Sequence, residues 1–76
     1  MKRLPALTAK QVIHIIRKLG FIEHRRRGSH AVFFNTQTQR RTVIPCHAGK
    51  TIKRPLLYAI IHDDLRITVE EFLKLL

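Results

Sequence analysis

The sequence has few of the residues that build disulfides, metal clusters or flexible tracts. In 76 residues it holds one cysteine (Cys46), three prolines, three glycines and no tryptophan. A lone thiol excludes an internal disulfide and is typical of a reducing compartment. The low glycine and proline content, without repeats or low-complexity stretches, argues against a disordered or fibrous chain. We therefore expect a single folded domain, residues 1–76, in the cytoplasm.

Long hydrophobic runs are also missing. No stretch approaches the roughly 20 apolar residues that cross a bilayer, and none resembles a signal peptide, so we expect no membrane association. At this length folding buries only about 60% of the surface of the unfolded chain, so we expect no deep substrate cavity. An active site should lie on an open surface that accepts an extended polymer.

Acidic residues are scarce, and most of them are clustered. Fifteen Lys and Arg stand against five Asp and Glu, which gives a net charge of +10. A field of this sign attracts nucleic acid first, then anionic membranes or acidic proteins. Four of the acids fall after residue 62, namely Asp63, Asp64, Glu70 and Glu71. We expect the polyanion-binding surface to exclude this C-terminal end.

Capping signals and apolar spacing predict three helices. Thr8 and Gln11 form a capping box before a helix that ends at Gly20. A second helix has Pro55 in its first turn. Its expected apolar stripe is Leu56, Leu57, Ile60 and Ile61. A second capping box at residues 68–71 opens a short final helix, with Phe72, Leu75 and Leu76 as its apolar residues.

Three segments between the helices are rich in β-forming residues and predict strands at 21–27, 30–35 and 40–47. The third should be an edge strand or should end at Pro45, which lacks a backbone donor. The order α-β-β-β-α with a short C-terminal helix predicts an α+β fold, a three-stranded antiparallel sheet with two helices on one face. This is the architecture of double-stranded RNA-binding domains.

Alternation along the strands defines two sheet faces. One holds Ala31, Phe33, Thr42, Ile44 and Cys46, and the other holds Val32, Phe34, Val43 and Pro45 beside two histidines. Only one face can pack on the helices, and the sequence leaves open which. The other face would expose apolar area unless a partner chain, or unpaired bases stacking on Phe34, covers it.

Two of the five histidines are brought together by the expected hairpin. If Asn35 pairs with Arg40, His30 faces Pro45 and His47 is its diagonal neighbour, about 7 to 8 Å away. We expect structural roles for His14 and His62, which fall in helices, and a place at the edge of the core or a phosphate contact for His24. Zinc is a weak alternative because neighbouring Cys46 and His47 point to opposite faces of a strand, and two-metal cleavage would need carboxylates on the basic face. We expect no metal and no cofactor.

Acid–base chemistry on RNA remains, because RNA carries its own nucleophile in the 2′-hydroxyl. An imidazole titrating near pH 6.5 suits removal of that proton. Cations would stabilise the phosphorane, and a helix N-terminus preceded by glycine binds phosphate through its backbone amides. The expected RNA-binding residues are Arg25, Arg26, Arg27, Ser29, Lys50, Lys53 and Arg54. His30 is the expected catalytic residue, with His47 as a possible second.

Ordered motifs resemble those of the HicA family of mRNA interferase toxins. They are Leu19-Gly20-Phe21, a basic strand into Gly28-Ser29-His30, Pro45-x-His47 with Gly49-Lys50, and Glu70-Glu71-Phe72-Leu73. The resemblance covers roughly residues 8–76. It implies a fold like that of double-stranded RNA-binding domains, ribosome-independent mRNA cleavage, a catalytic histidine at His30, and a HicB-type antitoxin that covers the active face.

The sequence departs from the family in three places and leaves two other functions open. The 36–39 loop lacks the usual glycine, Cys46 replaces an aliphatic residue, and Leu65-Arg66 replaces a glycine-containing turn. A non-catalytic RNA-binding module or a basic protein-interaction domain would also fit the charge.

Overall fold

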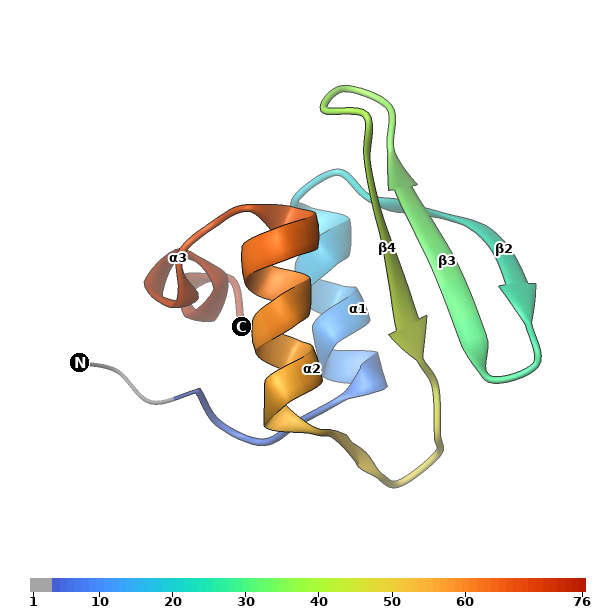
Figure 1. Cartoon of the computed structure of the whole chain (residues 1–76), viewed down its shortest axis with the longest axis vertical. Coiled ribbons are helices and arrows are strands. Elements are labelled where there is room, and N and C mark those ends of the chain that lie inside the picture. Colours follow the sequence, from blue (N-terminus) through green and yellow to red (C-terminus); the bar gives the residue numbers. More distant parts are fainter. Residues whose placement is uncertain (1–3) are drawn as a thin grey trace.

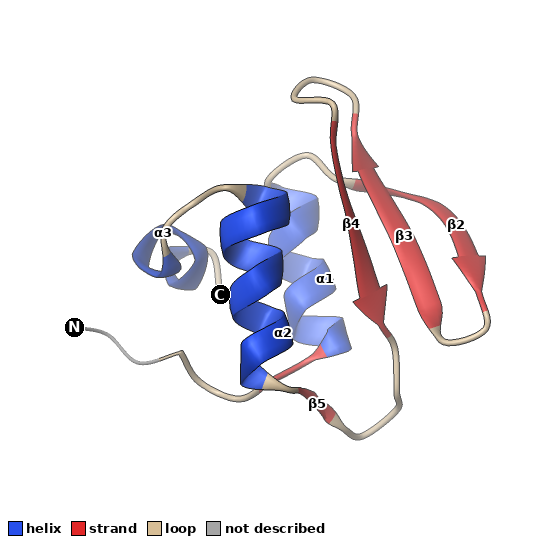
Figure 2. Ribbon diagram, in the orientation of Figure 1, coloured by secondary structure: helices blue, strands red, loops and turns tan. Residues whose placement is uncertain are grey.

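A three-stranded antiparallel sheet with helices on one face forms the centre of the computed structural model, which describes residues 4–76 (Figures 1 and 2). The strands are β2 (Ile22–Arg27), β3 (His30–Asn35) and β4 (Arg40–Pro45), and they lie in that order across the sheet. Helix α1 (Ala9–Lys18) lies beside α2 (Arg54–Ala59) against the sheet. The predicted α+β fold is confirmed.

The register of the β3–β4 hairpin matches the prediction. Asn35 pairs with Arg40, and His30 pairs with Pro45, where β4 ends. Both predictions for Pro45 hold, because β4 is an edge strand and also ends at this residue. Asn35 supports the turn with its buried side chain, whose Oδ1 accepts from the backbone N–H groups of Gln37 and Thr38. The four-residue loop therefore fixes which residues share a face.

Burial shows which face of the sheet packs on the helices, which the sequence left open. Ala31, Phe33, Thr42 and Ile44 are buried against the helices, and Cys46 packs at the edge of the same core. The alternate residues Val32, Phe34, Val43 and Pro45 are only half-buried. The face that carries them is not covered by a helix (Figure 1), and it is called the open face below.

The ends of α1 form as predicted. Thr8 and Gln11 make a complete capping box, in which the Thr8 side chain accepts from the Gln11 N–H and the Gln11 side chain accepts from the Thr8 N–H. At the other end the Phe21 and Gly20 N–H groups donate to the carbonyls of Ile16 and Arg17, which is a Schellman motif. Gly20 has φ +100°, a conformation open to glycine. This turn brings buried Phe21 back onto the helix.

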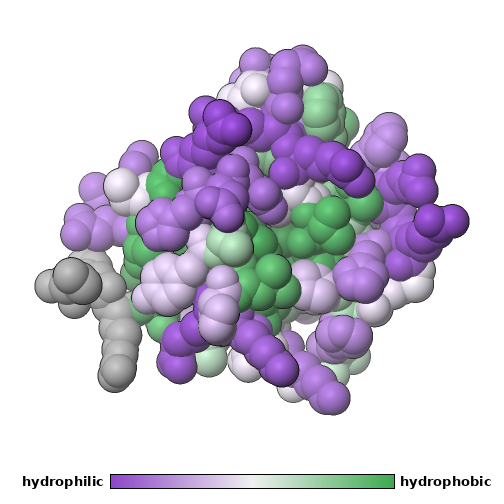
Figure 3. Space-filling view, in the orientation of Figure 1, coloured by the Kyte–Doolittle hydropathy of each residue, from purple (hydrophilic) through white to green (hydrophobic). Residues whose placement is uncertain are grey.

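The second helix changes character halfway along. Pro55 lies in its first turn, as predicted, and α2 continues into a π-helical segment, η1 (Ile60–Leu65). Leu57, Ile60 and Ile61 are buried, but Leu56 is 43% exposed, so its assignment to the stripe was wrong. Leu56 lines a shallow hollow between α2 and β4, together with Val43 and Ile60. Figure 3 shows hydrophobic surface over α2 and toward β4.

A third, shorter helix closes the structure. The capping box of α3 (Val69–Lys74) is complete, and its hydrogen bonds from Thr68 lower the pKa of Glu71. Phe72 is buried and Leu75 is partly buried, whereas Leu76 lies beyond the end of α3 and is 56% exposed. None of the helices in residues 4–76 has the length and apolar content needed to cross a membrane.

The structure adds one element that the sequence did not predict. Two-residue strands β1 (Leu7–Thr8) and β5 (Thr51–Ile52) pair in antiparallel fashion. Buried Leu7 and Ile52 face each other in this pair. The pairing fixes the segment before α1 to the segment before α2, and so holds the 46–50 loop beside α1.

Candidate functional site

His30 lies on the open face, at the first residue of β3, and is exposed to solvent. Its cross-strand partners are Arg27 on β2 and Pro45 on β4. Directly opposite residues share a sheet face, with Cβ atoms about 5 Å apart. An exposed imidazole therefore stands beside one guanidinium on a surface that an extended polymer can reach.

Alternation divides the three consecutive arginines between the two faces of the sheet. Arg27 pairs with His30 and Arg25 pairs with Val32, so both belong to the open face. Arg26 pairs with buried Ala31 and belongs to the helix side. The predicted triple-arginine site is thus two arginines near His30 and one arginine behind them.

Further cations join the open face from positions that the sequence analysis did not assign to the site. A hollow of about 380 Å³ on this face is lined by His24, Arg25, Val32, Phe34 and Arg41. A register shift between Glu23 and Arg25 places neighbouring His24 and Arg25 in the same hollow. Arg41 could have been found from its register with Phe34, but the bulge has no clear signal in the sequence.

The turn that precedes His30 is held by backbone bonding. Gly28 has φ +58°, which a two-residue hairpin turn favours at this position. The half-buried Ser29 offers its carbonyl to the Cys46 N–H, so the ladder extends one residue beyond the end of β4. This bond fixes the turn, and with it the start of β3, to the third strand.

His47 does not lie where the hairpin predicted it. Because β4 ends at Pro45, His47 is beyond the sheet, exposed, in the loop that leads to β5. It lines a hollow together with Arg26 and residues of α1, and His30 is not part of that lining. The strand pairing from which their proximity was predicted thus ends at Pro45, before it reaches His47.

The predicted cations near the start of α2 have different surroundings. Lys50 and Lys53 are exposed. Arg54 donates from Nε to the Leu4 carbonyl at 3.0 Å, which gives it a structural role in joining α2 to the N-terminal segment. The Lys53 side chain makes no capping hydrogen bond at this helix.

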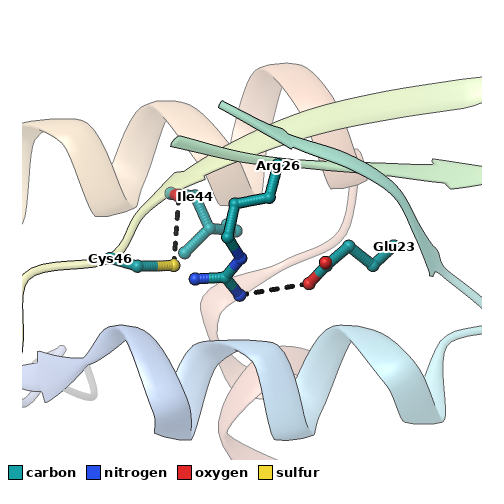
Figure 4. A network of polar contacts seen from close by, with 4 residues as sticks. All are labelled: Glu23, Arg26, Ile44 and Cys46. Carbon is teal, nitrogen blue, oxygen red and sulfur yellow. Dashed lines mark hydrogen bonds and ion pairs between the residues drawn. The ribbon is translucent and has the colours of Figure 1, made fainter. Parts of the chain in front are cut away.

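Arg26 is the arginine of β2 that lies on the helix side of the sheet. Its Nη2 contacts Glu23 Oε1 at 3.1 Å, and its guanidinium lies between Glu23 and Cys46, above α1 (Figure 4). The hydrogen bond that Arg26 donates to the Glu23 carboxylate raises the pKa of Arg26. Arg26 is therefore a permanent positive charge on this side.

The acidic residues of the C-terminal end lie away from His30, as Asp64 shows. Asp64 Oδ2 accepts from Thr42 Oγ1 at 2.8 Å, on the side where η1 packs on β4, the strand at the opposite edge from β2. Arg40 on the same strand donates to the Leu65 carbonyl at 3.0 Å. In the described part of the chain, residues 4–76, His, Cys, Asp and Glu side chains form no group of three suited to a metal ion.

Comparison with known families gives one match. A family model described as the HicA toxin of bacterial toxin–antitoxin systems matches residues 9–65, which is 57 of the 76 residues. The matched region runs from the start of α1 to the end of η1 and includes the whole sheet. No curated protein matches the chain.

Proposed function

Since the chain belongs to the HicA toxin family of bacterial toxin–antitoxin systems, we propose that it is a metal-independent endoribonuclease that cleaves mRNA, with His30 as its catalytic residue. The family implies an antitoxin partner. We propose a HicB-type antitoxin that covers the open face and thereby blocks access to His30.

In the proposed reaction His30 acts as a general base on the ribose next to the cleaved bond. The imidazole takes the proton of the 2′-hydroxyl, and the 2′-oxygen forms a bond to the neighbouring phosphorus. The bond from phosphorus to the 5′-oxygen of the next nucleotide breaks, and that oxygen takes a proton from water. The products are a 2′,3′-cyclic phosphate and a 5′-hydroxyl end, and His30 returns its proton to solvent.

Arg27 is proposed to stabilise the charge that develops on the phosphate. It is the direct cross-strand partner of His30, so both side chains can reach one phosphodiester. Arg25 and Arg41 lie farther along the same face, around Val32 and Phe34. They would hold neighbouring phosphates, while a base stacks on Phe34.

The observation that carries this proposal is the placement of His30, exposed and beside Arg27 on an uncovered cationic sheet face. A histidine that merely filled the hairpin would not require that arrangement. His47 is left out of the reaction because it lies in another hollow, with Arg26 and α1. Ser29 supports the position of His30 through its backbone carbonyl.

The chemistry of the cut ends tests the proposal. Purified protein is incubated with single-stranded RNA in excess chelator, and the ends of the fragments are identified. We expect cleavage to persist and to leave 2′,3′-cyclic phosphates. Fragments with 3′-hydroxyl ends would contradict the route through the 2′-hydroxyl, and absence of cleavage with retained RNA binding would favour the non-catalytic RNA-binding module.

A further inference from the structure

A second hollow lies on the helix side of β2, away from the open face that carries His30. It has a volume of about 790 Å³ and lies between α1, Arg26 of β2 and the loop after β4. This volume is in the range of small-molecule sites, about 300 to 1,000 Å³. The apolar part of its lining consists of small or aliphatic side chains, namely Ala9, Ile13, Cys46 and Ala48. Such a surface accommodates a flat, weakly polar group.

Cationic side chains enter this hollow from α1. Lys10, His14 and Arg17 all line it. Their spacing of four and three residues places them on one side of the helix, over roughly 10 Å of its axis. Lys10, His14 and Arg17 are exposed, and none of them makes a side-chain hydrogen bond to another of residues 4–76.

Two more basic side chains, Arg26 and His47, line the hollow on the side opposite α1. Arg26 extends from β2 toward α1, and His47 lines the hollow from the loop (Figure 4 shows Arg26 above the helix). No residue that lines the hollow is acidic. The carboxylate of Glu23 contacts Arg26 but is not part of the lining. The hollow thus combines an apolar surface with a cationic rim.

We propose that this hollow binds a nucleotide of the same single-stranded RNA that is cut at His30, with the base against the apolar lining and its phosphates on Lys10, Arg17 and Arg26. The inference rests on the proposed function, and extends it to a second contact site on α1. Base contact combined with cationic backbone contact is the general mode of binding single strands.

The edge position of β2 connects the two sites. All six β2 residues are exposed, and in the part of the chain that the structure describes no strand pairs with the outer edge of β2. Within β2, Arg25 and Arg27 belong to the open face of the sheet and Arg26 belongs to the helix side. An RNA strand that passes around the edge would meet the three consecutive arginines in turn, from the open face into the hollow.

Charge argues for RNA and against an acidic segment of the antitoxin as the occupant. Three fixed cations and two histidines line the hollow without a single acid. A polynucleotide supplies a negative charge at every unit and a base for the apolar lining, whereas an acidic protein segment would have to alternate both kinds of side chain. We therefore expect the RNA, and not the antitoxin, to occupy the hollow.

The test uses the double variant Lys10→Ala, Arg17→Ala in the full chain. Binding is measured by fluorescence anisotropy on a labelled 2′-O-methyl RNA of about 12 nucleotides, which carries no 2′-hydroxyl to be cut. The matched control is Lys18→Ala, Lys74→Ala, which removes the same charge, with Lys18 on the same helix and neither lysine in the hollow. Circular dichroism verifies the fold of each.

We expect the hollow variant to bind about tenfold more weakly at 0.15 M salt, with a salt slope reduced by about 1.4, because each lost phosphate contact removes about 0.7. The control should stay within about twofold of the parent, since distant surface charges are screened. Equal affinity and slope for the hollow variant and the parent overturn the inference, as does a loss of antitoxin binding with RNA binding intact.

Cys46 provides a second measurement without any substitution. It is the sole cysteine and lines the hollow, so its reaction with a thiol reagent reports on occupancy. Saturating 2′-O-methyl RNA should slow this reaction several-fold, and an unchanged rate overturns the inference. Cleavage of unmodified RNA by the parent is measured in parallel. If the parent cuts RNA while both binding results are negative, the inference fails and the proposed function stands.

Discussion

Arg27 and His30 face each other across the turn formed by Gly28 and Ser29, and both belong to the open face of the sheet. The pair is the last of the β2–β3 ladder, so its geometry is fixed by backbone pairing. Neither side chain is buried, which leaves both free to contact RNA. Replacing either side chain should therefore change activity without changing stability.

Replacement of Arg27 by alanine should reduce the rate of RNA cleavage roughly 10- to 100-fold, because a cation next to the developing phosphorane charge is lost. Thermal stability should be unchanged, since the side chain is exposed. Arg27→Lys restores a charge without the planar donor pair and should recover part of the rate. A variant Arg27→Ala with parental cleavage would remove Arg27 from the site.

Asn35 is expected to be a main determinant of stability. Its buried side chain donates from Nδ2 to the Leu19 carbonyl at 3.0 Å and accepts the two loop N–H groups, so it joins the hairpin to the end of α1. Asn35→Leu leaves these groups unpaired and should cost about 2 kcal/mol in the free energy of unfolding. This corresponds to a Tm lower by roughly 10 °C.

Asn35→Asp is the matched comparison, because it keeps the acceptor of the loop N–H groups but replaces the donor to Leu19 with a charged carboxylate oxygen. Its Tm should lie between those of the parent and Asn35→Leu. Equal Tm values for all three proteins would show that the side chain does not join the hairpin to the helix.

Within residues 4–76 two non-glycine residues hold left-handed backbone conformations. Gln39 ends the hairpin loop with φ +61°, and Arg66 ends η1 with φ +57°. Gln39→Gly and Arg66→Gly should each stabilise the protein by about 0.5 to 1 kcal/mol, because glycine adopts this region without a steric cost. Chemical denaturation measures the gain.

The control for the glycine substitutions is Gln37→Gly in the same loop. Gln37 does not have a positive φ, so added backbone freedom should destabilise the protein there. If Gln37→Gly and Gln39→Gly change the free energy of unfolding in the same direction, backbone strain is not the cause.

Local signals accounted for most of the fold. The two capping boxes, Gly20 and the four-residue loop each determine structure within a few residues, and they predicted helix ends and strand register correctly. The pair of strands β1 and β5 was missed, because two residues per strand give no periodic signal. Leu56 was misassigned because a run of apolar residues does not show which of its members turn outward.

The candidate site was predictable only where it depends on register. The pairing of Arg27 with His30 follows from a two-residue turn, and alternation alone could have separated Arg26 from its neighbours. The position of His47 could not be predicted, because the strand ended two residues before it. The hollow on α1 depends on how a helix packs beside a distant strand, which no local pattern encodes.

Replacement of His30 by alanine tests the central claim most directly, with cleavage of single-stranded RNA and binding of its 2′-O-methyl form measured on the same protein. His62→Ala is the control, because His62 is an exposed histidine on η1 that stacks on Tyr58 at 6.1 Å. With the fold verified, His30→Ala should cut at least about 100-fold more slowly while binding stays within about twofold, and His62→Ala should behave like the parent. Cleavage by His30→Ala at the parental rate would contradict the assignment of His30 as the catalytic residue.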